Sequence, residues 1–210
     1  MVRGATFVGT LLVVWITLRP FPDLGGLRID EASTGKDTLT YALFGGLAVL
    51  MLALTMRDNW RGLASLLTPA FVLFGAWIVV SVVLSLDPDT SVRRFALTVC
   101  VIAVAAALML LPKSERELMR WFSIAALALL AVCYLGILLA PNLSTHLATD
   151  TLEPALAGDW RGSFGHKNAA AAVMTMLLFL GIYICRAGGR LSGAVIIGLA
   201  ALFLLLKLPS

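Results

Sequence analysis

The residues with the greatest chemical potential lie in one short polar segment, which reads DWRGSFGHKN over residues 159–168. Arg161, His166 and Lys167 can all donate hydrogen bonds to an anion. An apolar run begins directly after Lys167, so we expect a helix to start there and to present unpaired N–H groups and the positive end of its dipole. Gly162 and Gly165 allow the backbone to turn tightly close to a ligand. The segment therefore predicts a site for a phosphate or pyrophosphate group, which arginine binds well in a bidentate manner.

Structural roles explain the same residues about equally well. Arginine and lysine side chains at the end of a membrane helix commonly extend to lipid headgroups. Trp160 and Phe164 are side chains of the kind that anchors a protein at the membrane interface. The residue chemistry taken alone leaves both interpretations open.

A resemblance favours the anion site. Residues 160–168, WRGSFGHKN, resemble the W-R-G-x-F-x-H-K-N signature of the O-antigen ligase and O-antigen polymerase superfamily, and are closest to its exopolysaccharide, or succinoglycan-type, polymerase branch. The setting is also similar, because the motif closes a polar loop and runs into an alanine-rich apolar segment.

The resemblance implies a multi-pass protein of the bacterial inner (plasma) membrane that acts in exopolysaccharide or O-antigen biosynthesis. Such proteins move a glycan from an undecaprenyl pyrophosphate carrier to a hydroxyl of a second glycan or of lipid A-core oligosaccharide. They are glycosyltransferases that need no metal, no cofactor and no nucleotide sugar. By the motif match, Arg161 would hold the donor pyrophosphate and stabilise the charge of the leaving group. His166 would join it as a catalytic residue, and Lys167 and Asn168 would bind the substrate.

Family members are longer, and their second half carries further arginines and a histidine that resembles a general base. The chain therefore resembles the amino-terminal part of a family member, and whether it is an enzyme by itself stays open. Among its own residues, His166 is the best candidate for a base. His146, Glu153 and Asp159 are expected to be solvated loop residues.

Arg93 and Arg94 form a second basic pair, which follows an Asp-Pro-Asp sequence at residues 87–89. They would add positive charge to a site on the same side of the membrane. A capped helix start whose arginines extend to headgroups is the better-supported interpretation.

The composition places all of these residues in a membrane protein. Of 210 residues, 60% are apolar and 13% are charged, against about 45–50% and about 25% in soluble domains. This excludes a soluble globular protein, a disordered chain and a disulfide scaffold. The net charge of +4 comes from basic residues that lie between apolar runs, which favours contact with membrane lipids over nucleic acid. Cys100, Cys133 and Cys185 lie inside apolar runs and are expected to face lipid or the core.

Seven charge-poor runs predict an all-α, polytopic transmembrane bundle of about seven helices, which we expect to form a single domain over residues 1–210. The runs are 4–18, 38–56, 63–86, 95–111, 121–140, 168–185 and 191–206. Pro69 predicts a kink or a late helix start in the third run. Pro141 predicts the end of the fifth helix.

The orientation follows from charge, although lysine and arginine divide evenly between the two sides. The loops on the amino-terminal side are short and basic, whereas the others are longer and contain most of the acids. The positive-inside rule therefore favours a cytoplasmic amino terminus. Segments 19–37, 87–94 and 141–167 would then face outward, with 141–167 as the long periplasmic or extracytoplasmic loop. The first run lacks a small-residue cleavage site and is expected to be retained as a helix.

Two functions other than glycan transfer fit parts of the pattern. A polysaccharide transporter or flippase would need ionisable residues in mid-helix, but the charges here lie at the ends of the runs. A non-catalytic subunit that binds the lipid-linked glycan would need the polar segment alone.

Overall fold

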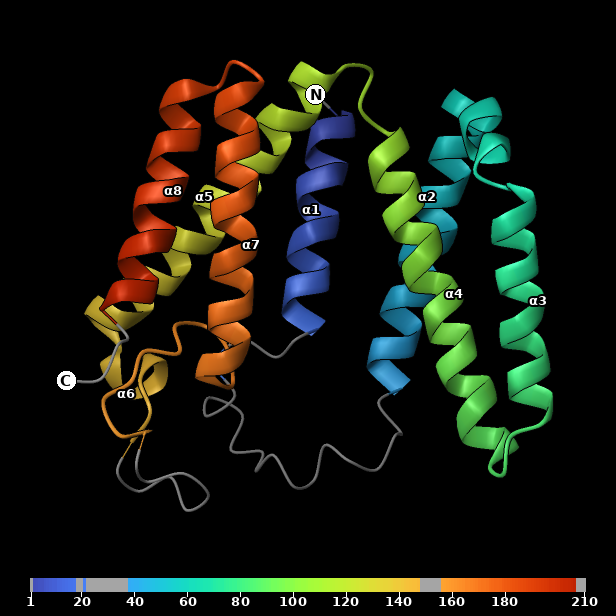
Figure 1. The fold of residues 1–210 in the computed structure, drawn as a ribbon, viewed down its shortest axis with the longest axis horizontal. Coiled ribbons are helices and arrows are strands. Elements are labelled where there is room, and N and C mark those ends of the chain that lie inside the picture. Colours follow the sequence, from blue (N-terminus) through green and yellow to red (C-terminus); the bar gives the residue numbers. More distant parts are fainter. Residues whose placement is uncertain (1, 18–20, 22–37, 148–155, 207–210) are drawn as a thin grey trace. The chain divides into compact units, whose positions relative to one another are not determined.

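The computed structural model describes residues 2–17, 21, 38–147 and 156–206. All the regular secondary structure in these residues is helical (Figure 1). Every one of the seven predicted runs is confirmed as a helix, and a short eighth helix follows the fifth run. The helices are α1 (Val2–Thr17), α2 (Thr38–Ser65), α3 (Pro69–Val83), α4 (Pro88–Leu110), α5 (Glu115–Leu139), α6 (Pro141–Ser144), α7 (Lys167–Arg186) and α8 (Arg190–Leu205). The all-α polytopic fold is confirmed.

Four of the described helices are long and apolar enough to cross a membrane. They are Tyr41–Ser65 within α2, Pro88–Leu110, Glu115–Leu139 and Lys167–Arg186. Each approaches or exceeds the roughly 20 residues that a bilayer requires. The chain is therefore a membrane protein with transmembrane helices, to which α1, α3 and α8 add shorter apolar helices.

The contacts within the chain gather into two compact units. Unit 1 comprises Met1–Thr10 and Ser33–Lys113, and unit 2 comprises Leu11–Ala32 and Ser114–Ser210. The single domain expected over residues 1–210 stays a prediction, and each unit is described here by itself.

Proline decides where α3 begins. Thr68 caps the helix by accepting the N–H of Phe71 on its hydroxyl (3.2 Å), and Pro69 occupies the first helical turn. Proline suits this position because its ring fixes φ and its missing N–H would have no helical partner. The late start expected from Pro69 is confirmed, and residues 63–65 end α2 instead of beginning α3.

The start of α4 corrects a sequence prediction. We expected a loop over residues 87–94, but the helix begins at Pro88 because the Asp87 carboxylate accepts the N–H of Thr90 (3.2 Å). Arg93 and Arg94 consequently lie in the second turn of α4, as expected for a capped helix start. The hydrogen bonds with Thr90 hold the pKa of Asp87 below its ordinary value, and the two arginines act in the same direction.

Polar contacts in unit 1 join the start of α1, the kink of α2 and the end of α4. Asn59 has non-helical backbone angles (φ −153°, ψ 54°), so α2 is kinked one residue after Asp58. Arg3 forms an ion pair with the Asp58 carboxylate, and its guanidinium also reaches the Leu111 carbonyl (3.5 Å). Arg3 of α1 thus contacts two other helices of the unit.

Unit 2 has a core built from α5, α7 and α8. Leu130 of α5, Met174 of α7 and Phe203 of α8 are fully buried in one cluster. The hairpin of α7 and α8 is close-packed at Gly181 and Gly193, since a Cβ on Gly193 would lie 2.6 Å from the Gly181 carbonyl oxygen. Glycine permits this approach of two helix backbones, as small residues commonly do in membrane helices.

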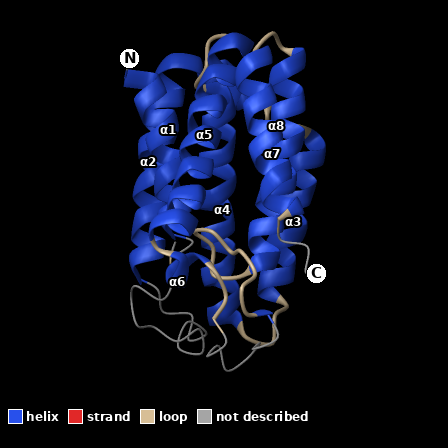
Figure 2. Cartoon of the chain, turned by 90° about the vertical axis from the view of Figure 1, so that its left-hand side faces the viewer, coloured by secondary structure: helices blue, strands red, loops and turns tan. Residues whose placement is uncertain are grey.

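The two ends of unit 2 have different constructions. At one end, α6 and the loop of residues 156–166 lie where α5 ends and α7 begins (Figures 1 and 2). At the other end, α5 and α8 begin and α7 ends, and the Tyr183 hydroxyl donates to the Glu115 carboxylate (2.7 Å). The polar segment singled out from the sequence belongs to the first of these ends.

Candidate functional site

Two short segments pair in antiparallel fashion and form what we call the clasp, residues 144–146 and 158–162. Thr145 and Trp160 form the β-bridge at its centre. The Ser144 carbonyl accepts the N–H groups of Arg161 and Gly162, both at 2.9 Å. His146 donates its N–H to the Asp159 carbonyl and accepts the N–H of Gly158, also at 2.9 Å each. The clasp fixes the backbone of the polar segment before α7 begins.

A glycine is required where the clasp meets α5. Gly162 has φ +59°, and a Cβ at this position would lie 3.1 Å from the Cys133 sulfur. The next residue, Ser163, is fully buried, and its hydroxyl lies 3.3 Å from the same sulfur. The motif is therefore pressed against α5, and Cys133 is a core residue, one of the two alternatives expected.

The aromatic residues of the motif serve packing. Trp160 meets Tyr134 and Phe203 edge to face, with ring centroids 6.3 Å and 5.8 Å apart. Phe164 is only 6% exposed. Both side chains join the core cluster of unit 2. They hold the loop on the helices, and a role as interface anchors stays a prediction.

Arg161 lies beside these aromatic residues in the sequence and is itself buried. The residue is only 3% exposed. A buried guanidinium is costly unless it is satisfied within the protein. Arg161, which was predicted to hold a pyrophosphate, is thus buried at this end of unit 2.

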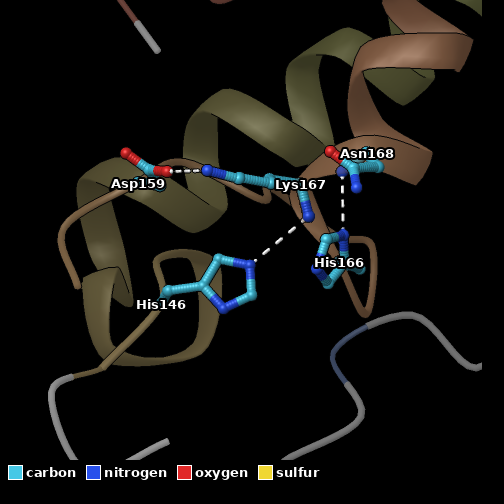
Figure 3. A network of polar contacts seen from close by, with 5 residues as sticks. All are labelled: His146, Asp159, His166, Lys167 and Asn168. Carbon is cyan, nitrogen blue, oxygen red and sulfur yellow. Dashed lines mark hydrogen bonds and ion pairs between the residues drawn. The ribbon is translucent and has the colours of Figure 1, made fainter. Parts of the chain in front are cut away.

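Lys167 and Asp159 form the central ion pair of the site. The Lys167 ammonium lies 2.5 Å from the Asp159 carboxylate, and both side chains are largely shielded (22% and 14% exposed). Figure 3 shows this pair beside the two histidines and Asn168. Asn168 is exposed at the start of α7. Asp159 is therefore a partner of the site's lysine, which corrects the prediction that it is a solvated loop residue.

His146 is the residue that the sequence analysis missed. It was expected to be solvated, but it is 5% exposed, and its ring lies 5.3 Å from that of His166. Its Nε2 accepts the N–H of Lys167 (3.3 Å), and Nδ1 of His166 accepts the N–H of Asn168 (3.0 Å). The signal available in the sequence was that the chain has only two histidines, one at each end of the same polar loop. Glu153, the third loop residue considered, lies outside the described residues.

The N–H groups expected to receive an anion are thus partly occupied. Of the first N–H groups of α7, those of Lys167 and Asn168 are bound by imidazole nitrogens. The N–H of Ala170 donates to the His166 carbonyl (3.2 Å). Arg161, His166, Lys167 and Asn168 are nevertheless brought to one end of unit 2. Arg93 and Arg94 belong to unit 1, and their contribution to this site stays a prediction.

Within the described part of the chain, no three His, Cys, Asp or Glu side chains gather as a metal site would require. Comparison with known proteins adds no assignment, since no family model, no curated protein and no solved structure matches the chain.

Proposed function

We propose that the chain is an inner-membrane glycan polymerase or ligase, or the amino-terminal part of one, in exopolysaccharide or O-antigen biosynthesis. It would transfer a glycan from undecaprenyl pyrophosphate to the hydroxyl of an acceptor glycan or of lipid A-core. One observation carries the proposal. Lys167 and His166 lie in one cluster of polar contacts at the start of α7, and Arg161, buried in the clasp six residues before Lys167, completes the order of the superfamily signature.

Stabilisation of the leaving pyrophosphate is the chemistry that this network suits best. Lys167 is held in place by Asp159 and is largely shielded from solvent, so its charge acts in a medium of low dielectric constant. A phosphate oxygen would replace the Asp159 carboxylate as the partner of the ammonium. Arg161 lies six residues before Lys167, within the clasp, and its positive charge would add to the same electrostatic stabilisation.

The position of the charges supports an outward-facing site. Arg116, Arg120, Arg186 and Arg190 are exposed at the end of unit 2 opposite the clasp. Lysine and arginine in short loops favour the cytoplasmic side. The loop of residues 141–167 would then face the periplasmic or extracytoplasmic side of a bacterial plasma membrane, where the lipid-linked donor is used.

A second candidate, a subunit that binds the lipid-linked glycan without chemistry, is favoured by the state of the histidines. The nitrogen with which each imidazole would accept a proton already accepts a backbone N–H. A general base needs a free acceptor nitrogen directed at the acceptor hydroxyl. His166 would therefore serve catalysis only after its hydrogen bond to Asn168 opens.

The first test compares substitutions of basic residues at the two ends of unit 2. In the native host, Lys167→Gln and Arg161→Lys should abolish or strongly reduce surface polysaccharide, because each removes a charge or the fork geometry from the site. Arg186→Gln is the matched control and should leave polymer amount and length unchanged. Membrane levels of all three variants are measured by immunoblot. Normal polymer in Lys167→Gln and Arg161→Lys at normal protein levels would refute the proposal.

The purified full chain separates the two candidates. With undecaprenyl pyrophosphate-linked glycan and an acceptor, an enzyme consumes the lipid-linked donor, whereas a binding subunit retains it without turnover. Binding of undecaprenyl pyrophosphate should weaken in Lys167→Gln and persist in Arg186→Gln under either candidate.

Topology is tested by single cysteines in a background without the three native ones. Asn142→Cys, at an exposed position of α6, should react with a membrane-impermeant thiol reagent in intact cells. Ala187→Cys, exposed in the turn after α7, should react only after the membrane is opened. The reverse pattern would place the loop in the cytoplasm and remove the proposed function with it.

A further inference from the structure

A cavity of about 610 Å³ lies between α2, α3 and α4 of unit 1. Helix α4 contacts both of the other two helices (Figure 1). The volume is within the range of about 300–1,000 Å³ that is typical of small-molecule sites. The walls consist of apolar side chains from all three helices, among them Met56, Phe71 and Ile102. Thr98 contributes the one hydroxyl of the lining residues, and this hydroxyl already donates to the Arg94 carbonyl (2.8 Å). The cavity therefore offers an occupant almost nothing but hydrocarbon contacts.

A smaller cavity of about 420 Å³ adjoins the first and has a polar end. The two cavities share four lining residues, which are Phe74, Ile78, Phe95 and Thr98. The smaller cavity extends toward the turn between α3 and α4, where Ser81, Ser91 and Arg94 line it. We call the two cavities together the groove. It is apolar along most of its length and positively charged at one end.

Loose packing of α3 leaves the groove open. No residue of α3 is buried, and Leu73 is 70% exposed. Gly75 lines the larger cavity, and a Cβ at this position would have no atom within 4 Å. An apolar surface without neighbouring atoms lacks the dispersion contacts that a close-packed interior provides. In a bilayer, lipid tails are the apolar material that can supply these contacts.

Arg94 is the hydrogen-bond donor available at the polar end. The Ser81 hydroxyl donates to the Trp77 carbonyl (2.9 Å), and the Ser91 hydroxyl lies 2.6 Å from that of Ser85. Arg94 is exposed, and no described residue forms an ion pair or a hydrogen bond with its guanidinium. A guanidinium has five N–H donors and binds a phosphate group well in a bidentate manner.

The other charged residues of the turn leave this arginine available. Asp87 caps α4 by accepting the N–H of Thr90. Asp89 and Arg93 are exposed in the first turns of α4. Of the charged residues of this turn that the structure describes, Arg94 alone lines the groove. The groove therefore presents one positive charge, at its polar end.

The length of the groove matches one leaflet of a bilayer. Ala106 lines the larger cavity twelve residues after Arg94, and α4 rises about 18 Å over this distance. The hydrocarbon core of a bilayer is about 30 Å thick, so that one leaflet contributes about 15 Å. A lipid whose phosphate lies at Arg94 would therefore extend one acyl chain along the groove without leaving its leaflet.

We propose that the groove binds one membrane phospholipid, with its phosphate on Arg94 and one acyl chain between α2, α3 and α4. The positive charge at one end, the apolar walls and the length of one leaflet together fit this ligand. The bound chain supplies the packing that α3 lacks. The inference goes beyond the proposed function and does not depend on it, because the groove belongs to unit 1 and the clasp belongs to unit 2.

The first test compares two neighbouring arginines by native mass spectrometry of the purified full chain. Delipidated protein in detergent is titrated with dioleoyl phosphatidylglycerol. Wild type and Arg93→Gln should bind one lipid with equal affinity. Arg94→Gln should bind it about tenfold more weakly, the smallest loss expected for a hydrogen bond to a charged group. Equal affinity of the two variants would overturn the proposal.

Two glycines test whether the acyl chain lies in the groove. Gly75→Leu places a side chain in the larger cavity and should abolish binding of the phospholipid. Gly46→Leu is the matched control, since Gly46 lies in α2, has no atom within 4 Å of an added Cβ and does not line the groove. It should bind the lipid as wild type does. Circular dichroism verifies the helical content of both variants. Unchanged binding by a folded Gly75→Leu would contradict the proposal.

Other ligands identify the occupant. Dioleoylglycerol has the same acyl chains without a phosphate and should bind about tenfold more weakly than the phospholipid. Equal binding would exclude a phosphate contact with Arg94. Undecaprenyl phosphate, whose chain is longer than a leaflet, should bind more weakly than the phospholipid. Its preferential binding through Arg94 would assign the groove to the glycan carrier and overturn the proposal. A lipid-free dimer that dissociates in Gly75→Leu would instead assign it to a second copy of the chain.

Discussion

The two ends of unit 2 contain the same kinds of basic residue, but these residues differ in exposure and in their polar contacts. At the end with the clasp, Arg161 is 3% exposed, Lys167 is paired with Asp159, and both histidines are bound to the start of α7. At the opposite end, Arg186 and Arg190 are exposed. The contact between Tyr183 and Glu115 at that end is also exposed.

The difference separates two roles of a charged residue at a helix end, anchoring at the membrane surface and placing a charge at a fixed position. Exposed arginines at the end of a membrane helix need only water and lipid headgroups. Enclosing an arginine and a lysine costs desolvation, which simple anchoring does not require. Asp159 offsets part of that cost for Lys167, whose ammonium is thereby held in a defined position.

The largest expected effect comes from a comparison of Gly162 and Gly188, which both have positive φ and lie at opposite ends of unit 2. Gly162→Ala should destabilise the protein by about 2–4 kcal/mol, because backbone strain adds to crowding against Cys133. Gly188→Ala should cost about 1 kcal/mol, since its φ of +99° is strained but nothing lies within 4 Å of the added Cβ. Unfolding in detergent, followed by circular dichroism, measures both. Equal losses would mean that the clasp is no more closely packed than the α7–α8 turn.

A smaller effect is expected from the carboxylates at the two ends. Asp159→Asn should cost about 1–2 kcal/mol, because it leaves the shielded Lys167 ammonium without its charged partner. Glu115→Gln should change the free energy of unfolding by less than about 0.5 kcal/mol, since its bond to Tyr183 is exposed. A double-mutant cycle of Asp159→Asn with Lys167→Gln isolates the pair. A coupling energy near zero would show that the pair behaves like an ordinary surface salt bridge.

The smallest effect concerns a helix start outside such a network, that of α4. The pKa of Asp87 is lowered by its bonds to Thr90. Its contribution to stability is therefore present above the ordinary carboxyl pKa and is lost as the pH falls through the lowered value. The Thr90 amide signal should move only below about pH 4 in wild type and should stay fixed in Asp87→Asn. Movement of that signal near neutral pH would mean that another group titrates at α4.

Local rules recovered most of the fold, because hydrophobic runs and proline act over short distances. All seven runs became helices, and Pro69 marked a late start. The start of α4 was placed seven residues too late because Arg93 and Arg94 interrupt the apolar run, although Asp87 and Pro88 are together a strong start signal. Charge alone was therefore a poor marker of the helix boundary.

The sequence predicted the residues of the candidate site but not the contacts between them. The segment of residues 159–168 was identified from its own side chains. The role of His146 could not be read in the same way, because it depends on pairing with a segment twelve residues further along. The packing of Trp160 and Gly162 likewise depends on α5 and α8, which supply Cys133 and Phe203. Residue spacing does not encode such contacts.

The backbone hydrogen bonds of His146 hold the two segments of the clasp together. The backbone of His146 is hydrogen-bonded to both Gly158 and Asp159. These bonds close a loop of the chain between residue 146 and residues 158–159. Doubling the length of such a closed stretch costs only about 0.6 kcal/mol of loop entropy. The backbone register of residues 158–162 is therefore set by these hydrogen bonds and depends only weakly on the number of residues that precede them in the loop.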